Sequence, residues 1–82
     1  MAETEIYAGL TEIFRDVFDD DTIVLKPEMT ADDLADWDSH NHISIIVASE
    51  VHFGVKFQTA EIEGLRNVGE LAQCIGRKLE SR

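Results

Sequence analysis

The sequence predicts an all-α protein: a small four-helix bundle of three main helices and one short helix. Apolar residues recur at intervals of three and four through most of the chain, as they do on one face of a helix. Capping residues and a single proline divide these segments from one another. The apolar-polar-apolar stretch at residues 55–57 has no second strand to pair with, so we expect no sheet.

The first helix is expected over residues 3–18, followed by a long connection over residues 19–38. The apolar face of this helix consists of Ile6, Leu10, Ile13, Phe14 and Val17. Three aspartates at 19–21 should end it, because negative charge opposes the negative end of the helix dipole. Pro27 cannot continue a helix interior, although residues 30–34 could form one helical turn. The apolar residues expected to hold the connection on the core are Ile23, Val24, Leu25, Met29, Leu34 and Trp37.

The second helix is expected over residues 39–53. Asp38 is a suitable N-cap, and Gly54 a suitable left-handed stop. The stripe predicted to face the core consists of Ile43, Ile46, Val47 and Val51.

A short third helix at about residues 60–64 would be capped by Thr59. Asn67 and Glu70 form a capping-box pattern at the start of the last helix. The apolar face predicted for that helix consists of Val68, Leu71, Ala72, Ile75 and Leu79. Cys74 lies beside this face and should be a small buried or half-buried residue.

The bulk properties indicate one domain over residues 1–82 and a strongly acidic surface. Seventeen acidic side chains face seven Lys and Arg, giving a net charge of -10. Such a surface repels nucleic acid and anionic membranes and favours basic patches on partner proteins, although solubility alone would also explain it. The single cysteine excludes an intramolecular disulfide. We expect no signal peptide and no membrane insertion, because the start lacks basic residues and the longest apolar run covers only residues 45–48.

The pair Asp38-Ser39 stands where the long acidic connection meets the second helix. A group attached to Ser39 would project into solvent, and its phosphate would lie near the N–H groups and positive dipole end of the helix. Asp38 would repel that phosphate somewhat, so it suits a helix cap or recognition by a modifying enzyme. Local chemistry by itself favours a plain helix cap.

A longer pattern surrounds this pair. It includes Asp38-Ser39, Ile43, residues 46–48, Glu50, Phe53-Gly54, Val55, Phe57 and residues 67–71. With this pattern the chain resembles the acyl carrier protein family over nearly its whole length. That family carries 4'-phosphopantetheine, taken from coenzyme A, on the serine of an Asp-Ser-Leu motif. The resemblance implies that Ser39 bears this cofactor covalently, with Asp38 beside it.

The resemblance also implies a carrier that is not itself an enzyme. It would hold acyl intermediates as thioesters for fatty acid, polyketide or other specialised biosynthesis. Its partners would be a phosphopantetheinyl transferase and acyl-loading and acyl-processing enzymes with basic patches, not nucleic acid. The residues implied in partner contacts are His40, Ile43, Val47 and Glu50. We expect a cytoplasmic monomer.

Three positions depart from the family pattern. His40 replaces the usual leucine, and Ser44 and Val51 replace residues that are commonly acidic. The run from Trp37 to Ser39, with His42, looks more like stand-alone carriers of specialised pathways. Two alternatives stay open: a peptidyl carrier holding an amino acid, and an unmodified helical interaction module, which the change at His40 motivates.

Other kinds of site are poorly supported by the sequence. His40 and His42 face different sides of a helix, and His52 lies nearly three turns from His42, so we expect no metal site. The aspartates from Asp16 onward lack the glycine and glutamate of a calcium-binding loop. Ser39 has no Gly-x-Ser-x-Gly elbow around it, which argues against a hydrolase.

Overall fold

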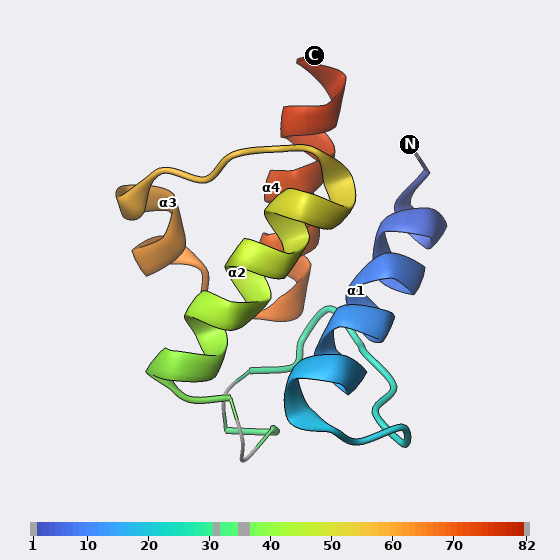
Figure 1. Cartoon of the computed structure of the whole chain (residues 1–82). Helices are drawn as coiled ribbons and strands as arrows, with labels where there is room; N and C mark the ends of the chain where they lie inside the picture. The colour runs from blue at the N-terminus through green and yellow to red at the C-terminus, as the bar shows by residue number, and fades with distance from the viewer. Residues whose placement is uncertain (1, 31, 35–36, 82) are drawn as a thin grey trace.

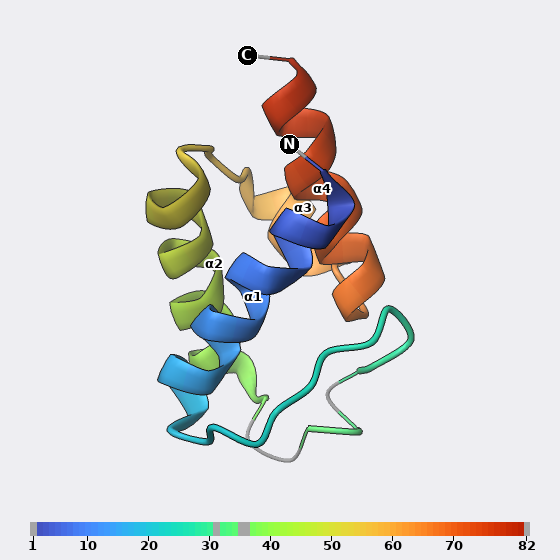
Figure 2. The ribbon, with the colours of Figure 1, turned by 90° about the vertical axis from the view of Figure 1, so that its right-hand side faces the viewer.

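Four helices account for most of the chain. The computed structural model describes residues 2–30, 32–34 and 37–81, and within them there is no strand. The helices are α1 (Glu3–Phe18), α2 (Ser39–Phe53), α3 (Thr59–Gly64) and α4 (Val68–Glu80). The all-α prediction is confirmed. The helices α1 and α3 lie on opposite sides of α2 and α4, and the long connection runs beneath the end of α1 and the start of α2 (Figures 1 and 2).

The core lies where α1 packs against α2 and α4. The predicted faces of α1 and α4 are confirmed, with Val17 and Leu79 half-buried at their ends. The largest fully buried hydrophobic side chains are Phe14, Leu10, Ile45, Ile46, Leu71, Ile75 and Val68. Gly9 allows α1 to approach α2 closely, because a Cβ there would come within 2.8 Å of the side chains of His52 and Phe53.

The predicted inward stripe of α2 is wrong except for Ile46. Ile43 and Val47 are about half exposed, at 51% and 52%, and Val51 is 81% exposed. The residues of α2 that face the core are Ile45, Ile46, Ser49 and Phe53. Apolar residues stand on more than one side of this helix, so their spacing did not determine which side faces inward.

The connection after α1 is held by local contacts. Asp19 adopts the left-handed conformation, with φ of 51°, and ends α1 as expected. The Arg15 side chain then donates a hydrogen bond from Nε to the Ile23 carbonyl, at 2.9 Å. Ile23 and Trp37 are buried, whereas Val24 is 64% exposed and does not hold the connection on the core. Neighbouring side chains in extended backbone point to opposite sides, so Ile23 and Val24 cannot both face inward.

The middle of the connection is fastened to the start of α4. The Val68 N–H donates to the Met29 carbonyl at 3.0 Å, and the Gly69 N–H donates to the Pro27 carbonyl at 2.9 Å. These bonds satisfy two of the backbone donors that every helix leaves unpaired at its N-terminus. The expected turn at residues 30–34 is closed by two hydrogen bonds: the N–H groups of Asp33 and Leu34 both donate to the Thr30 carbonyl. Residue 31 of this turn lies outside the described residues.

The caps of the last two helices agree with the predictions in part. The Asn67 side chain accepts a hydrogen bond from the Glu70 N–H at 2.8 Å, so the predicted N-cap of α4 is confirmed. The Glu70 carboxylate, however, accepts from the Arg66 N–H at 2.8 Å. Thr59 is not the cap of α3: it is the first helical residue, and Gln58 before it supplies the capping box.

Candidate functional site

Ser39 is the first residue of α2, and its side chain is exposed. The residue before it, Asp38, is the N-cap: its Oδ1 accepts from the Asn41 N–H at 2.9 Å. The Asp38 carbonyl also accepts from the His42 N–H at 2.8 Å. The Ser39 hydroxyl takes no part in these capping bonds and is therefore open to a modifying enzyme. The predicted cap is confirmed, and Asp36 of the same segment lies outside the described residues.

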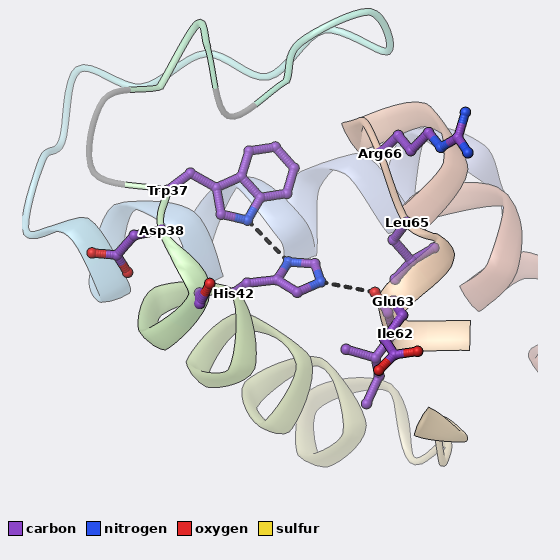
Figure 3. A pocket seen from close by; sticks show the side chains of 8 residues that line it. Trp37, Asp38, His42, Ile62, Glu63, Leu65 and Arg66 are labelled. Atoms are coloured by element: carbon purple, nitrogen blue, oxygen red, sulfur yellow. Dashed lines mark hydrogen bonds between the residues drawn. The ribbon is translucent and has the colours of Figure 1, made fainter. Parts of the chain in front are cut away.

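A pocket of about 380 Å³ opens beside Ser39 (Figure 3). The residues on the α2 side of this pocket are Trp37, Asp38, Ser39 and His42. Those on the opposite side, from α3 and the segment after it, are Ile62, Glu63, Leu65 and Arg66. The pocket thus mixes apolar walls with groups of both charges, next to the one hydroxyl at the start of α2.

His42 spans this pocket from one side to the other. The Trp37 indole donates a hydrogen bond from Nε1 to His42 Nδ1 at 3.0 Å, and His42 Nε2 lies 3.1 Å from the Ile62 carbonyl oxygen (Figure 3). Trp37 in turn packs edge-to-face on Phe14 of α1, with ring centroids 5.3 Å apart. His42 is half-buried, at the edge of the site where the sequence left open either a packed or an exposed residue.

Comparison with known proteins agrees with this architecture. The acyl carrier protein of Acidothermus cellulolyticus is 33% identical over 75 residues, which cover 92% of this chain and 89% of that protein. The meromycolate extension acyl carrier protein of Mycolicibacterium smegmatis is 37% identical over 78 residues, covering 95% and 78%. The chain belongs to the acyl carrier protein family. No protein-family model matches it.

A solved structure of the family has the same fold. It is the solution NMR structure of the holo acyl carrier protein from Geobacter metallireducens, which is 47% identical. The two structures superpose with a TM-score of 0.86, covering 93% of this chain and 87% of that one. Membership of the acyl carrier protein family implies a phosphopantetheine prosthetic group and contact with biosynthetic enzymes.

The start of α2 suits the prosthetic group of an acyl carrier protein. The exposed hydroxyl of Ser39 stands at the N-terminus of a 15-residue helix, where N–H groups and the helix dipole favour a phosphate. The adjacent pocket offers apolar and polar walls to a chain attached there. Asp38 adds a nearby negative charge, but one of its oxygens already accepts the capping bond.

The four residues expected to contact partners of an acyl carrier protein differ in their surroundings. His40, Ile43 and Val47 are exposed and lie along one face of α2, and Val51 continues this face. Glu50 is half-buried, and its Oε2 accepts a hydrogen bond from the Phe57 N–H at 2.8 Å. Glu50 therefore stabilises the segment that follows α2, while the other three present their side chains to solvent.

Two ionisable groups in and beside α3, Glu61 and Cys74, have pKa values that their surroundings shift. The hydrogen bond from Lys78 lowers the pKa of the Glu61 carboxyl, and a bond from the Gln58 N–H adds to this. Burial raises the pKa of the Cys74 thiol, and the nearby Glu61 charge raises it further. Cys74 is therefore a neutral buried thiol, as the sequence suggested, and not a reactive thiolate.

Neither a metal site nor a membrane-spanning helix is found among the described residues. Among the residues that the structure describes, no three His, Cys, Asp or Glu side chains are placed to hold a metal ion. Within the same residues, no helix is both long and apolar enough to cross a membrane.

Proposed function

We propose that Ser39 is the attachment point of 4'-phosphopantetheine and that the chain carries acyl groups as thioesters on this arm. The observation that carries the proposal is the exposed, uncommitted hydroxyl of Ser39 at the first residue of α2, beside a pocket. When bound, the group supplies a terminal thiol that forms the thioester. We further propose that residues 1–82 make one carrier domain that works as a monomer.

A phosphopantetheinyl transferase would install the arm from coenzyme A. The Ser39 oxygen forms a new bond to the phosphorus that bears pantetheine, and the bond from that phosphorus to the adenosine bisphosphate half breaks. The hydroxyl proton leaves to the transferase or to solvent. No oxidant or reductant is needed, and the chain itself acts as substrate and not as catalyst.

Intact-protein mass spectrometry tests this assignment. We expect incubation with coenzyme A and a broad-specificity transferase to add the mass of one phosphopantetheine group to the chain. Ser39→Ala should abolish the gain, whereas Ser44→Ala, at a half-buried serine of the same helix, should leave it intact. An unchanged mass for the natural chain would favour the unmodified interaction module, and a gain by Ser39→Ala would place the arm elsewhere.

Partner enzymes would approach the exposed face of α2. We propose that His40, Ile43 and Val47 touch these enzymes, with Glu50 at the border of the contact, and that basic patches on the enzymes meet the net charge of -10. The three exposed side chains carry no negative charge, so the attraction comes from the rest of the acidic surface. The contact on α2 itself is therefore mainly apolar.

The electrostatic part of this proposal predicts a salt dependence. Surface charges are screened over about 10 Å at 0.1 M salt, so the rate of loading by the transferase should fall as salt rises. The loading rate is measured in stopped assays, as the amount of holo protein formed over time at several salt concentrations. A rate that does not change with salt would leave the apolar contact as the only recognition element.

The names of the relatives support acyl cargo over amino acid cargo. The Mycolicibacterium smegmatis relative is described as a meromycolate extension acyl carrier protein, and the Acidothermus cellulolyticus relative as an acyl carrier protein. We therefore place this chain in fatty-acid-type or related specialised biosynthesis. Loading by an adenylating enzyme with an amino acid, and not by acyl-transferring enzymes, would instead identify a peptidyl carrier.

A further inference from the structure

The helix α3 is the least firmly packed helix of the molecule. It has six residues, Thr59–Gly64, and none of them is buried. Only Ile62, with Leu65 just after the helix, packs in part against the core. A helix this short is not stable by itself in water, so its position depends on the contacts that hold it.

Polar contacts hold α3 from two sides. On one side, Lys78 of α4 donates to the Glu61 carboxylate at 2.8 Å, and the Cys74 thiol of the same helix donates to it at 3.7 Å. On the side of Ser39, the ring of His42 reaches the Ile62 carbonyl oxygen at 3.1 Å. The His42 contact crosses the pocket that Ser39 lines, so it fixes the separation of the two pocket walls (Figure 3).

The hydrogen bonds of His42 determine where its proton lies. An indole N–H can only donate, so Trp37 makes His42 Nδ1 an acceptor. In the neutral ring the proton is then on Nε2, which donates to the Ile62 carbonyl. Trp37 is 7% exposed and rests on Phe14, so this arrangement leads from the core of the bundle to the backbone of α3.

We propose that His42 is a positioning residue that fastens α3 to α2 and sets the width of the pocket beside Ser39. We call the set Trp37, His42 and Ile62 the His42 clamp. Its meaning for an acyl arm depends on the function proposed above, because the pocket would receive the arm or its acyl group only if Ser39 is modified. The clamp itself is a property of the unmodified chain.

The geometry makes the clamp sensitive to protonation. A second proton on the ring would have to occupy Nδ1, where the Trp37 N–H already points. The two donors would then face each other and the bond to Trp37 would break, so the ring would still donate from Nε2 to the Ile62 carbonyl but would no longer be held from the core. The charged residues that line the same pocket as the ring are Asp38 before α2, Glu63 of α3 and Arg66 after it. Phe14 of α1, behind Trp37, is apolar.

Nuclear magnetic resonance on the unmodified protein tests the clamp. We expect His42→Phe to shift the Trp37 indole N–H signal, because the variant removes the acceptor of that N–H. Hydrogen exchange of the α3 amides should become about threefold to tenfold faster, as expected for the loss of one hydrogen bond. Exchange in α1 and α4 should not change.

Two control variants separate the clamp from general loosening. His40→Asn changes an exposed histidine in the same turn of α2, and both signals should stay as in the natural chain. Lys78→Gln removes the salt bridge on the other side of α3, so α3 exchange should rise while the indole signal stays as in the natural chain. Unchanged α3 exchange in a folded His42→Phe protein would overturn the proposal.

The natural chain provides a second measurement if His42→Phe does not fold. Nitrogen NMR of the histidine rings should show His42 Nδ1 as a hydrogen-bond acceptor and Nε2 as the protonated nitrogen. A proton on Nδ1 with Nε2 bare would overturn the clamp. Because these experiments use unmodified protein, they are independent of the mass measurement on Ser39: either proposal can fail while the other stands.

Discussion

Where α1 meets α2 and α4, the contact consists of apolar side chains that solvent hardly reaches, such as Leu10, Ile45 and Leu71. On the opposite side, α3 buries no residue fully and is held by the partial packing of the Ile62 side chain, by a salt bridge and by the His42 clamp. Apolar burial is strong and indifferent to pH, whereas exposed polar contacts are weak and depend on charge. The molecule therefore places its pocket between a rigid wall, α2, and a wall that can move, α3.

The largest effect should come from the apolar side. Leu71→Ala removes a side chain with no exposed surface and should lower the free energy of unfolding by about 2–5 kcal/mol. Denaturant unfolding measures this, with Val51→Ala as the matched control. Val51 is 81% exposed, so its change should stay within about 0.5 kcal/mol. If Val51→Ala lowered the free energy of unfolding as much as Leu71→Ala does, Val51 would be buried, and α2 would face the core with its other side.

An intermediate effect is expected at the start of α2, where the rigid wall meets the site. Asp38→Ala removes the cap of the Asn41 N–H and should lower the free energy of unfolding by about 1 kcal/mol. Asp38→Asn keeps an acceptor oxygen and should unfold nearly as the natural chain does. Thermal or denaturant unfolding measures both variants. If Asp38→Asn lost as much as Asp38→Ala, the carboxylate charge and not the cap would be the stabilising feature.

The smallest effect on global stability is expected at α3. Lys78→Gln should lower the free energy of unfolding by less than about 1 kcal/mol at neutral pH, because the salt bridge is partly exposed. The pKa of Glu61 is lowered in the folded chain, so its contribution is present above the unfolded pKa and is lost as pH falls through the folded pKa.

The Lys78→Gln variant should therefore lose less stability on acidification than the natural chain. Its Glu61 carboxyl should also titrate at higher pH, which carbon-detected NMR can follow. An identical Glu61 titration in both proteins would show that Lys78 does not hold α3 in solution.

Local chemistry explains which parts of the fold could be predicted. The bounds of α2, residues 39–53, follow from Asp38 before the helix and Gly54 after it. Gly54 has the left-handed conformation, with φ of 68°, that was expected of it. The cap of α4 at Asn67 was found in the same way. Each of these features depends on residues within one helical turn, so the sequence displays it directly.

Features that depend on packing were harder to predict. The inward face of α2 includes Ser49, which is fully buried, and excludes Ile43, Val47 and Val51. Ser49 is buried although it is polar, so hydrophobicity along the helix did not decide which residue faces inward at this position. Which of two apolar stripes faces inward is decided by the neighbouring helices, and the spacing along one helix does not contain that information.

The site itself was predicted only in part. The cap at Asp38 was predicted correctly and the attachment at Ser39 stays a prediction, whereas the hydrogen bonds of His42 were not predicted. Trp37 and His42 are only five positions apart, on either side of the first residues of α2, so the sequence could have indicated a hydrogen bond between their side chains. The third member is a backbone carbonyl twenty positions further on, and a carbonyl has no identity in a sequence. Only the placement of α3 reveals that contact.

Trp37 is the one tryptophan of the chain, and it is buried beside Ser39 and bonded to His42. The tryptophan fluorescence of the protein therefore arises beside Ser39, at the edge of the core where the indole packs on Phe14. Excitation of this indole gives a label-free optical signal from the place where an arm would be attached and loaded. Events at Ser39 can thus be followed in real time on the natural chain, without an added dye or a second reporter residue.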